Sequence, residues 1–178
     1  MKAKNEIPID ILRELVSVTP DGRLFWRNRP RSYFSSDKDW KRWNSRYAEK
    51  EAFNTANAYG YKTGRVLGVS IYAHRVVWAL HTGAWPYPFL DHINGIRSDN
   101  RVENLRVVSK QENNRNARKR VDNKSGHTGI TKVGDRFQVN VRFNGKQKTV
   151  GYYRDLNEAI SVRDQAYKTF GYSERHGK

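Results

Sequence analysis

Residues 90–116 read LDHINGIRSDNRVENLRVVSKQENNRN, and their pattern predicts two short strands followed by a helix. Asp91 and His92 directly follow a short apolar stretch, and the Asn-Gly pair just after them is typical of a tight turn. Residues 104–108 return as the second strand, and Ser109 marks the expected start of the helix. Such an arrangement can bring side chains of the first strand and of the helix together around one cation.

The residue types in this stretch suit a metal-assisted reaction. Asp91 and an asparagine amide on the helix offer oxygen ligands, which favour Mg²⁺ or Mn²⁺ over zinc. His92 is largely neutral near pH 7, so its imidazole can take a proton from water. Asn113 and Asn114 both lie on the predicted helix and point about 100° apart, so the helix phase decides which of them faces the ion. Taken singly, each residue is better explained as a turn-stabilising or structural group, and the prediction depends on their combination.

The composition points to a polyanionic partner inside a cell. The 178 residues carry 34 Lys and Arg against 18 Asp and Glu, a formal charge of +16. The chain has no long apolar run, which favours nucleic acid over a membrane. Without cysteine there is no disulfide, no thiolate zinc site and no cysteine nucleophile. The start, MKAKNEIPID, lacks the apolar stretch of a signal peptide, so we expect an intracellular protein that is not secreted.

The rest of the amino-terminal part predicts short helices and hairpins around small cores. Residues 7–18 have helical spacing, and residues 35–49 set an aromatic stripe of Trp40, Trp43 and Tyr47 that we interpret as core packing rather than a base-stacking platform. A helix is expected from His74 to a closing Gly83, with a structural role for that histidine. The stretch ENNRNARKRVDNKSG has almost nothing to bury and predicts a linker. We therefore divide the chain into 1–112, a basic linker 113–126, and 127–178.

The carboxy-terminal segment predicts a small sheet covered by one helix. Residues 136–143, RFQVNVRF, alternate apolar and polar side chains with a period of two. Asn144-Gly145 then gives the strongest short hairpin signal, and KQKTVGYY follows as the returning strand. Residues 155–170 set their apolar side chains mostly on one side of a helix that Asp155 caps. The expected fold class for the whole chain is α+β, with three antiparallel strands packed on one helix in this segment.

The combination DHINGIRSDNRVENL, followed by Asn113, resembles the His-Asn-His (HNH) endonucleases of the homing-like phage and intron-encoded branch, in which asparagine replaces the last histidine. The resemblance implies a ββα-metal nuclease core within residues 1–112. It also implies that Asp91 and Asn113 hold the metal, that His92 activates the water, and that Asn104 braces the loop bearing His92.

Residues 123–171 resemble the Apetala-two-like DNA-binding domain of plant transcription factors and phage HNH nucleases. The resemblance is carried by Ser125-Gly126, Gly129, the Asn-Gly hairpin, Gly151 before an aromatic residue, and the Ala-containing helix. That family lays its three-stranded sheet in the major groove of DNA. The implied contact face comprises Thr131, Arg136, Gln138, Asn140, Arg142, Gln147 and Thr149. An ordinary solvated sheet surface is the alternative interpretation of this face.

Together these features predict a Mg²⁺- or Mn²⁺-dependent endonuclease that nicks double-stranded DNA at preferred sites. By resemblance, the products carry 5′-phosphate and 3′-hydroxyl ends. We expect a monomer in a bacterial or phage-infected cell, without a membrane partner or a small-molecule cofactor. Two other functions remain open at this point: a non-catalytic DNA-binding regulator with a decayed nuclease site, and an RNA-binding protein.

Overall fold

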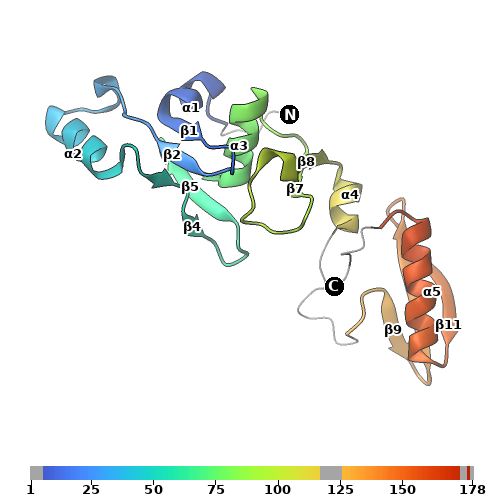
Figure 1. The fold of residues 1–178 in the computed structure, drawn as a ribbon. Helices are drawn as coiled ribbons and strands as arrows, with labels where there is room; N and C mark the ends of the chain where they lie inside the picture. Colours follow the sequence, from blue (N-terminus) through green and yellow to red (C-terminus); the bar gives the residue numbers. More distant parts are fainter. Residues whose placement is uncertain (1–5, 117–125, 173–175, 177–178) are drawn as a thin grey trace. The chain divides into compact units, whose positions relative to one another are not determined.

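The computed structural model describes residues 6–116, 126–172 and 176, and it divides the chain into two compact units, Met1–Val107 and Val108–Lys178 (Figure 1). Both units combine helices with small antiparallel sheets, which confirms the α+β class. Within the described residues, every helix is too short or too polar to cross a membrane. Residues 117–125, most of the predicted linker, lie outside the described residues.

The first unit contains three small sheets with the strand orders β1-β2-β3, β4-β5-β6 and β7-β8. Its elements in chain order are α1 (Ile9–Leu15), β1 (Val16–Val18), β2 (Leu24–Trp26), η1 (Arg31–Tyr33), α2 (Asp37–Tyr47), β3 (Glu51–Ala52), β4 (Thr55–Ala56), β5 (Lys62–Val66), β6 (Val69–Tyr72), α3 (Ala73–Thr82), β7 (Phe89–His92), η2 (Val102–Asn104) and β8 (Leu105–Val108). The last of these reaches one residue past the boundary of the unit.

One hydrophobic core holds this unit together. Leu12 and Leu15 of α1, Leu24 of β2 and Val76 of α3 are fully buried in it. Leu105, the first residue of β8, belongs to the same core, so the loop that precedes it is tied to the body of the unit. Burial of each of these side chains stabilises the fold by about 1.5–3 kcal/mol. Strands of only two to five residues depend on this contribution.

The aromatic stripe on α2 lies at the surface of the unit and outside the hydrophobic core. None of the α2 residues is buried, and Ser36 caps the helix by accepting from the Asp39 amide. The Trp43 ring packs edge-on against Trp26 with centroids 5.7 Å apart, and the Arg29 guanidinium lies 3.9 Å from the Trp43 ring centroid. The expectation of core packing was therefore wrong in detail, because the stripe packs on a cation and on aromatic rings in a half-buried layer.

The second unit holds one three-stranded antiparallel sheet, in the order β11-β10-β9, and a helix that covers it. Its elements are α4 (Lys110–Arg115), β9 (Ile130–Val133), β10 (Arg136–Phe143), β11 (Lys146–Tyr153) and α5 (Leu156–Thr169). Asn144 and Gly145 both have positive φ, 50° and 77°, as the two-residue hairpin between β10 and β11 requires. Ile130, Val139 and Ala159 form its buried core, which places α5 on the apolar face and leaves the opposite face to solvent. The helix α4 includes the first residues of the segment that we predicted as linker.

Candidate functional site

His92 is the last residue of β7 and its side chain is buried, with 3% of the residue exposed. Its Nε2 lies 3.1 Å from Oδ1 of Asn100, which is also buried. A carboxamide oxygen only accepts hydrogen bonds, so this contact places the imidazole proton on Nε2 and makes Nδ1 the basic nitrogen. The contact therefore selects the tautomer that a general base would need.

The turn between β1 and β2 holds Asn100 in place. Gly22 has φ of 77°, and a Cβ atom at this position would overlap the backbone carbonyl group of Asn100. Glycine is the residue that allows such a close backbone approach. Packing against this turn keeps Asn100 buried beside His92.

Asn104 closes the loop that follows His92. Its Oδ1 accepts from the backbone amide of Asn94 at 3.0 Å, and its Nδ2 donates to Oδ1 of Asn94 at 3.0 Å and to the carbonyl of Asp99 at 2.8 Å. Its own carbonyl accepts from the amide of Ile93 at 2.8 Å. One buried side chain thus joins both ends of the loop, a geometry that suits the bracing role expected for it.

Asp91 is half-buried, and its Oδ2 lies 3.3 Å from Nη2 of Arg106 on β8. Asn113 lies on α4, where Ser109 and Glu112 form a capping box. That helix belongs to the second compact unit, so the pairing of Asp91 with Asn113, or with Asn114, stays a prediction.

The donor chemistry at Asp91 suits a divalent ion that keeps most of its ligands as water and phosphate. Among the described residues there is no group of three or more His, Asp or Glu side chains that could hold a metal ion. One carboxylate, one amide and a bound phosphate are a usual set for Mg²⁺, which is held by few protein groups. The set is poor for zinc, which takes three or four nitrogen or sulfur ligands.

A second histidine and a tyrosine surround the imidazole of His92. The ring centroid of His74, on α3, lies 5.0 Å from that of His92, and the Tyr61 ring lies 5.4 Å from His74 and 5.9 Å from His92. Burial lowers the pKa of His74 to about 3, helped by the charges of His92 and Arg75. Burial also lowers the pKa of His92, opposed by the hydrogen bond that its Nε2 donates to Oδ1 of Asn100. Both imidazoles are therefore neutral near pH 7, as a general base must be.

Residues 71–115 match the model of the HNH endonuclease family. The matched interval contains the buried His92, its partner Asn100 and the loop-closing Asn104. No curated protein and no solved structure matched the chain. The match supports an HNH endonuclease domain in this interval, and with it an enzyme that cleaves DNA. The remainder of the chain, including the carboxy-terminal sheet, lies outside the match.

The residues of the HNH motif were predicted from the sequence, whereas several of their partners were not. Asn100 was quoted only as part of the motif, although it makes the hydrogen bond to the imidazole. The expected structural role of His74 left out its contact with His92. The position of Asn100 between the two strands made it a candidate partner of His92. The segment contains several asparagines, however, and the sequence does not show which of them faces the imidazole.

The predicted DNA-contact residues lie on the solvent face of the β11-β10-β9 sheet in the second unit. Residues that stand opposite each other in an antiparallel pair share one face of the sheet. The opposed pairs are Thr131 with Gln138, Asn140 with Thr149, and Arg142 with Gln147. Arg136 lies two residues before Gln138 on β10 and so shares this face. The structure thus gathers all seven predicted residues on one face.

Hydrogen bonds join the amides of this face into a row that includes one residue sequence reasoning missed. Nε2 of Gln138 donates to the Thr149 hydroxyl at 3.1 Å and to the Tyr152 hydroxyl at 3.0 Å. The Thr149 hydroxyl in turn donates to Oδ1 of Asn140 at 3.0 Å. Tyr152 is 53% exposed and stands opposite Gln138, so it belongs to the same face.

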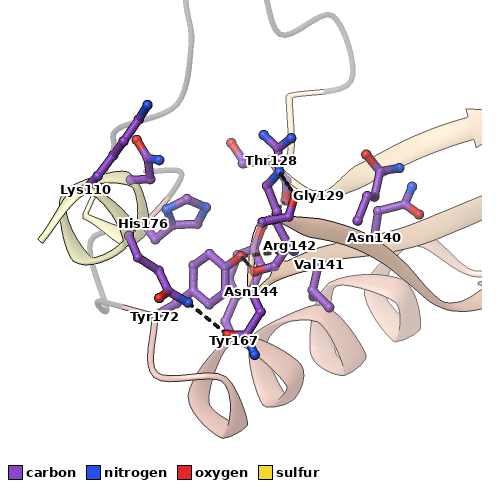
Figure 2. Close-up of a pocket in the computed structure, with 14 residues that line it drawn as sticks. Lys110, Thr128, Gly129, Asn140, Val141, Arg142, Asn144, Tyr167, Tyr172 and His176 are labelled. Atoms are coloured by element: carbon purple, nitrogen blue, oxygen red, sulfur yellow. Dashed lines mark hydrogen bonds between the residues drawn. The ribbon is translucent and has the colours of Figure 1, made fainter.

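Two tyrosines fix the end of β10 from the helix side. Figure 2 shows Tyr167 of α5 and Tyr172, which follows that helix, beside Arg142. Their rings stack with centroids 4.4 Å apart, and the Tyr172 hydroxyl accepts from the Arg142 amide at 3.0 Å and donates to the Arg142 carbonyl. The Tyr167 hydroxyl donates to the carbonyl of Thr128 at 3.2 Å. The hydrogen bonds of Tyr172 hold the backbone of β10 at Arg142, and four of the seven predicted contact residues lie on that strand.

Proposed function

We propose that this protein is a metal-dependent HNH endonuclease that nicks double-stranded DNA at preferred sites. The observation that carries the proposal is the buried His92, whose hydrogen bond to Asn100 selects its tautomer. His92 directly follows Asp91 in the sequence, and both residues lie in the interval that matches the HNH family. The presence of Asp91, His92, Asn104 and Asn113 together favours catalysis over a DNA-binding regulator with a decayed site. In this proposal β7, β8 and α4 would supply the strands and the helix of a ββα-metal site.

In the proposed reaction, Nδ1 of His92 takes a proton from a water molecule. The water oxygen forms a bond to phosphorus, the bond from phosphorus to the 3′ oxygen breaks, and the leaving 3′ oxygen takes a proton from a solvent water molecule. Asp91 and Asn113 would hold a Mg²⁺ or Mn²⁺ ion, which supplies charge stabilisation at the leaving oxygen when bound. Asn104 keeps the His92 loop closed, and Asn100 keeps the imidazole in its basic tautomer. The products carry a 5′ phosphate and a 3′ hydroxyl.

In this proposal the carboxy-terminal sheet acts as an Apetala-two-like DNA reader that sets where the enzyme cuts. Its solvent face combines two exposed arginines, Arg136 and Arg142, with a row of amides and hydroxyls. Arginine suits backbone phosphates, whereas the amides of Gln138 and Asn140 suit the edges of bases in the major groove. A basic face with amides in its middle is the pattern that such a reader needs.

Mapping of cleavage sites on random-sequence duplex DNA with Mg²⁺ present tests the proposed function. The expected result is a limited set of sites, cut on one strand, with ends that DNA ligase reseals without further treatment. Single-stranded RNA of the same length should remain intact. Random cutting, or ends that ligase cannot join, would contradict the proposed specificity or the proposed chemistry.

Variants of the sheet face should change this site profile in two different ways. Arg136→Ala should lower affinity to a similar extent on all sequences and reduce the salt slope of binding by about 1, as expected for one lost phosphate contact. Gln138→Ala should relax site preference more than it lowers total binding. Lys132→Ala is the matched control, because Lys132 stands opposite Phe137 and so lies on the other face of the sheet. Equal effects of Arg136→Ala and Lys132→Ala would contradict a contact by this face.

A further inference from the structure

We propose that Arg97 binds a DNA phosphate next to the bond that is cut, an assignment that rests on the proposed nuclease function. Arg97 lies in the loop between β7 and η2, five residues after His92. It is half-buried, and none of the roles described above uses it. Its place, its anchoring and its charge each support the assignment.

The guanidinium of Arg97 is held beside the candidate site by neutral groups. Its Nη1 donates to the carbonyl oxygen of Tyr59 at 2.7 Å, and its Cζ lies 5.0 Å from the centroid of the Tyr61 ring. That same ring lies 5.9 Å from the ring of His92. Figure 1 shows the loop after β7 next to the hairpin of β4 and β5, and the hydrogen bond to Tyr59 joins the two. Arg97 is thus one aromatic ring away from the proposed general base.

The hairpin that anchors Arg97 has a fixed shape. Oδ1 of Asn57 accepts from the backbone amides of Tyr59 and Tyr61 at 3.0 Å and 3.1 Å. The backbone amide of Asn57 also donates to the Tyr61 carbonyl at 2.9 Å. The carbonyl that receives Arg97 therefore has a defined direction, and little side-chain entropy remains to be lost when Arg97 binds an anion.

The other arginines near His92 are neutralised by carboxylates, and Arg97 is not. Arg101 makes two hydrogen bonds to the carboxylate of Asp99, at 2.9 Å and 2.8 Å, and Arg106 pairs with Asp91 at 3.3 Å. Within the described part of the chain, Arg97 has no ion pair with a carboxylate. Its positive charge therefore lacks a carboxylate partner there, one aromatic ring away from His92.

This combination fits a phosphate better than a structural role. A guanidinium has five N–H donors in a planar fork that matches two phosphate oxygens, and the Tyr59 carbonyl uses one of them. The carbonyl and the ring are both neutral partners, so neither of them compensates the charge of the guanidinium. A phosphate next to the scissile bond would supply the missing negative charge.

The test compares Arg97→Gln with wild type on duplexes that carry one uncharged methylphosphonate at a time around the mapped cut. Glutamine keeps a donor for the Tyr59 carbonyl and removes the charge. Arg65→Gln is the matched control, because Arg65 is an exposed arginine near the far end of β5. Arg97→Lys restores the charge without the fork. Thermal melting of all variants checks that the fold is kept.

We expect Arg97→Gln to slow cleavage by about tenfold to a hundredfold, the usual effect of one charge-assisted hydrogen bond, and Arg65→Gln to stay within about twofold of wild type. Arg97→Lys should recover part of the loss. One methylphosphonate position should slow the wild type by a similar factor and have no further effect on Arg97→Gln. Independent effects at every position, or equal rates for Arg97→Gln and Arg65→Gln, would overturn the assignment.

The same design separates a failure of this assignment from a failure of the proposed function. If the wild type does not cut DNA, the nuclease proposal fails. In that case footprinting defines a bound duplex, and the equilibrium affinity of each protein for the methylphosphonate series of that duplex is measured in EDTA. A position whose effect disappears in Arg97→Gln would still establish the phosphate contact, and the absence of any such position would overturn it.

Discussion

Replacement of His92 by alanine is expected to slow DNA cleavage by roughly a hundredfold or more, the usual effect of removing a general base. The reason is that Nδ1 of this imidazole is the proposed acceptor of the proton from water, and alanine offers no substitute. Affinity for DNA should stay within about twofold, since the proposed binding contacts lie on the sheet of the second unit and at Arg97. Single-turnover rates with saturating enzyme give the first quantity, and fluorescence anisotropy in EDTA gives the second.

His81→Ala is the matched control for this variant. His81 is an exposed histidine on α3, and its loss should leave the cleavage rate near that of wild type. If His92→Ala cleaved as fast as His81→Ala, the general base would have to be another group. A parallel loss of DNA affinity in His92→Ala would instead point to a folding defect.

Loss of the acceptor at Asn100 should slow cleavage by about tenfold to a hundredfold, because His92 would no longer be held in one tautomer. Asn100→Leu is close in size and cannot accept a hydrogen bond, whereas Asn100→Asp keeps an acceptor oxygen at the same place. We therefore expect the aspartate variant to retain most of the activity that the leucine variant loses. The nitrogen chemical shifts of the His92 ring report the tautomer directly.

The tautomer measurement separates positioning from simple stability. In wild type and Asn100→Asp, the ring should carry its proton on Nε2, whereas in Asn100→Leu both neutral tautomers should be populated. A leucine variant that is less active but keeps the Nε2 proton would contradict the role assigned to Asn100. Melting temperatures of the three proteins show how much of the effect is a loss of folded protein.

Local patterns were enough to predict the elements of the site. The strand that ends at His92, the returning strand β8, and a helix capped by Ser109 follow from turn residues, periodicity and a capping pattern, all of which act within a few residues. The same holds for the hairpin at Asn144-Gly145, where both residues adopt the left-handed conformation that the turn requires. In these places local propensity and the final structure agree.

Contacts between distant segments account for what was missed. Tyr61 and His74 come from a hairpin and a helix that precede the motif, and only the packed core brings their rings next to His92. The hydrogen bond from Arg97 to Tyr59 joins residues 38 positions apart. Sequence spacing carries no information about such pairs, because the core and the three small sheets determine which loops meet.

The aromatic stripe on α2 is a second case in which the sequence pattern did not identify the packing partner. Helical spacing of Trp40, Trp43 and Tyr47 indicated a packed face, but periodicity does not identify what the face packs against. In the structure the partners include the Arg29 guanidinium and the Trp26 ring, so the stripe stays half-buried. A cation between aromatic rings replaces the apolar core that the pattern favoured.

The most direct test of metal-dependent nicking is the conversion of supercoiled plasmid DNA to open circles by the purified 178-residue protein, with Mg²⁺ and with EDTA. We expect open circles with Mg²⁺ and with Mn²⁺, and unchanged supercoiled plasmid in EDTA, because the oxygen ligands of Asp91 and Asn113 would hold an ion that the reaction requires. Full cleavage in EDTA, or intact plasmid at every Mg²⁺ and Mn²⁺ concentration, would contradict it.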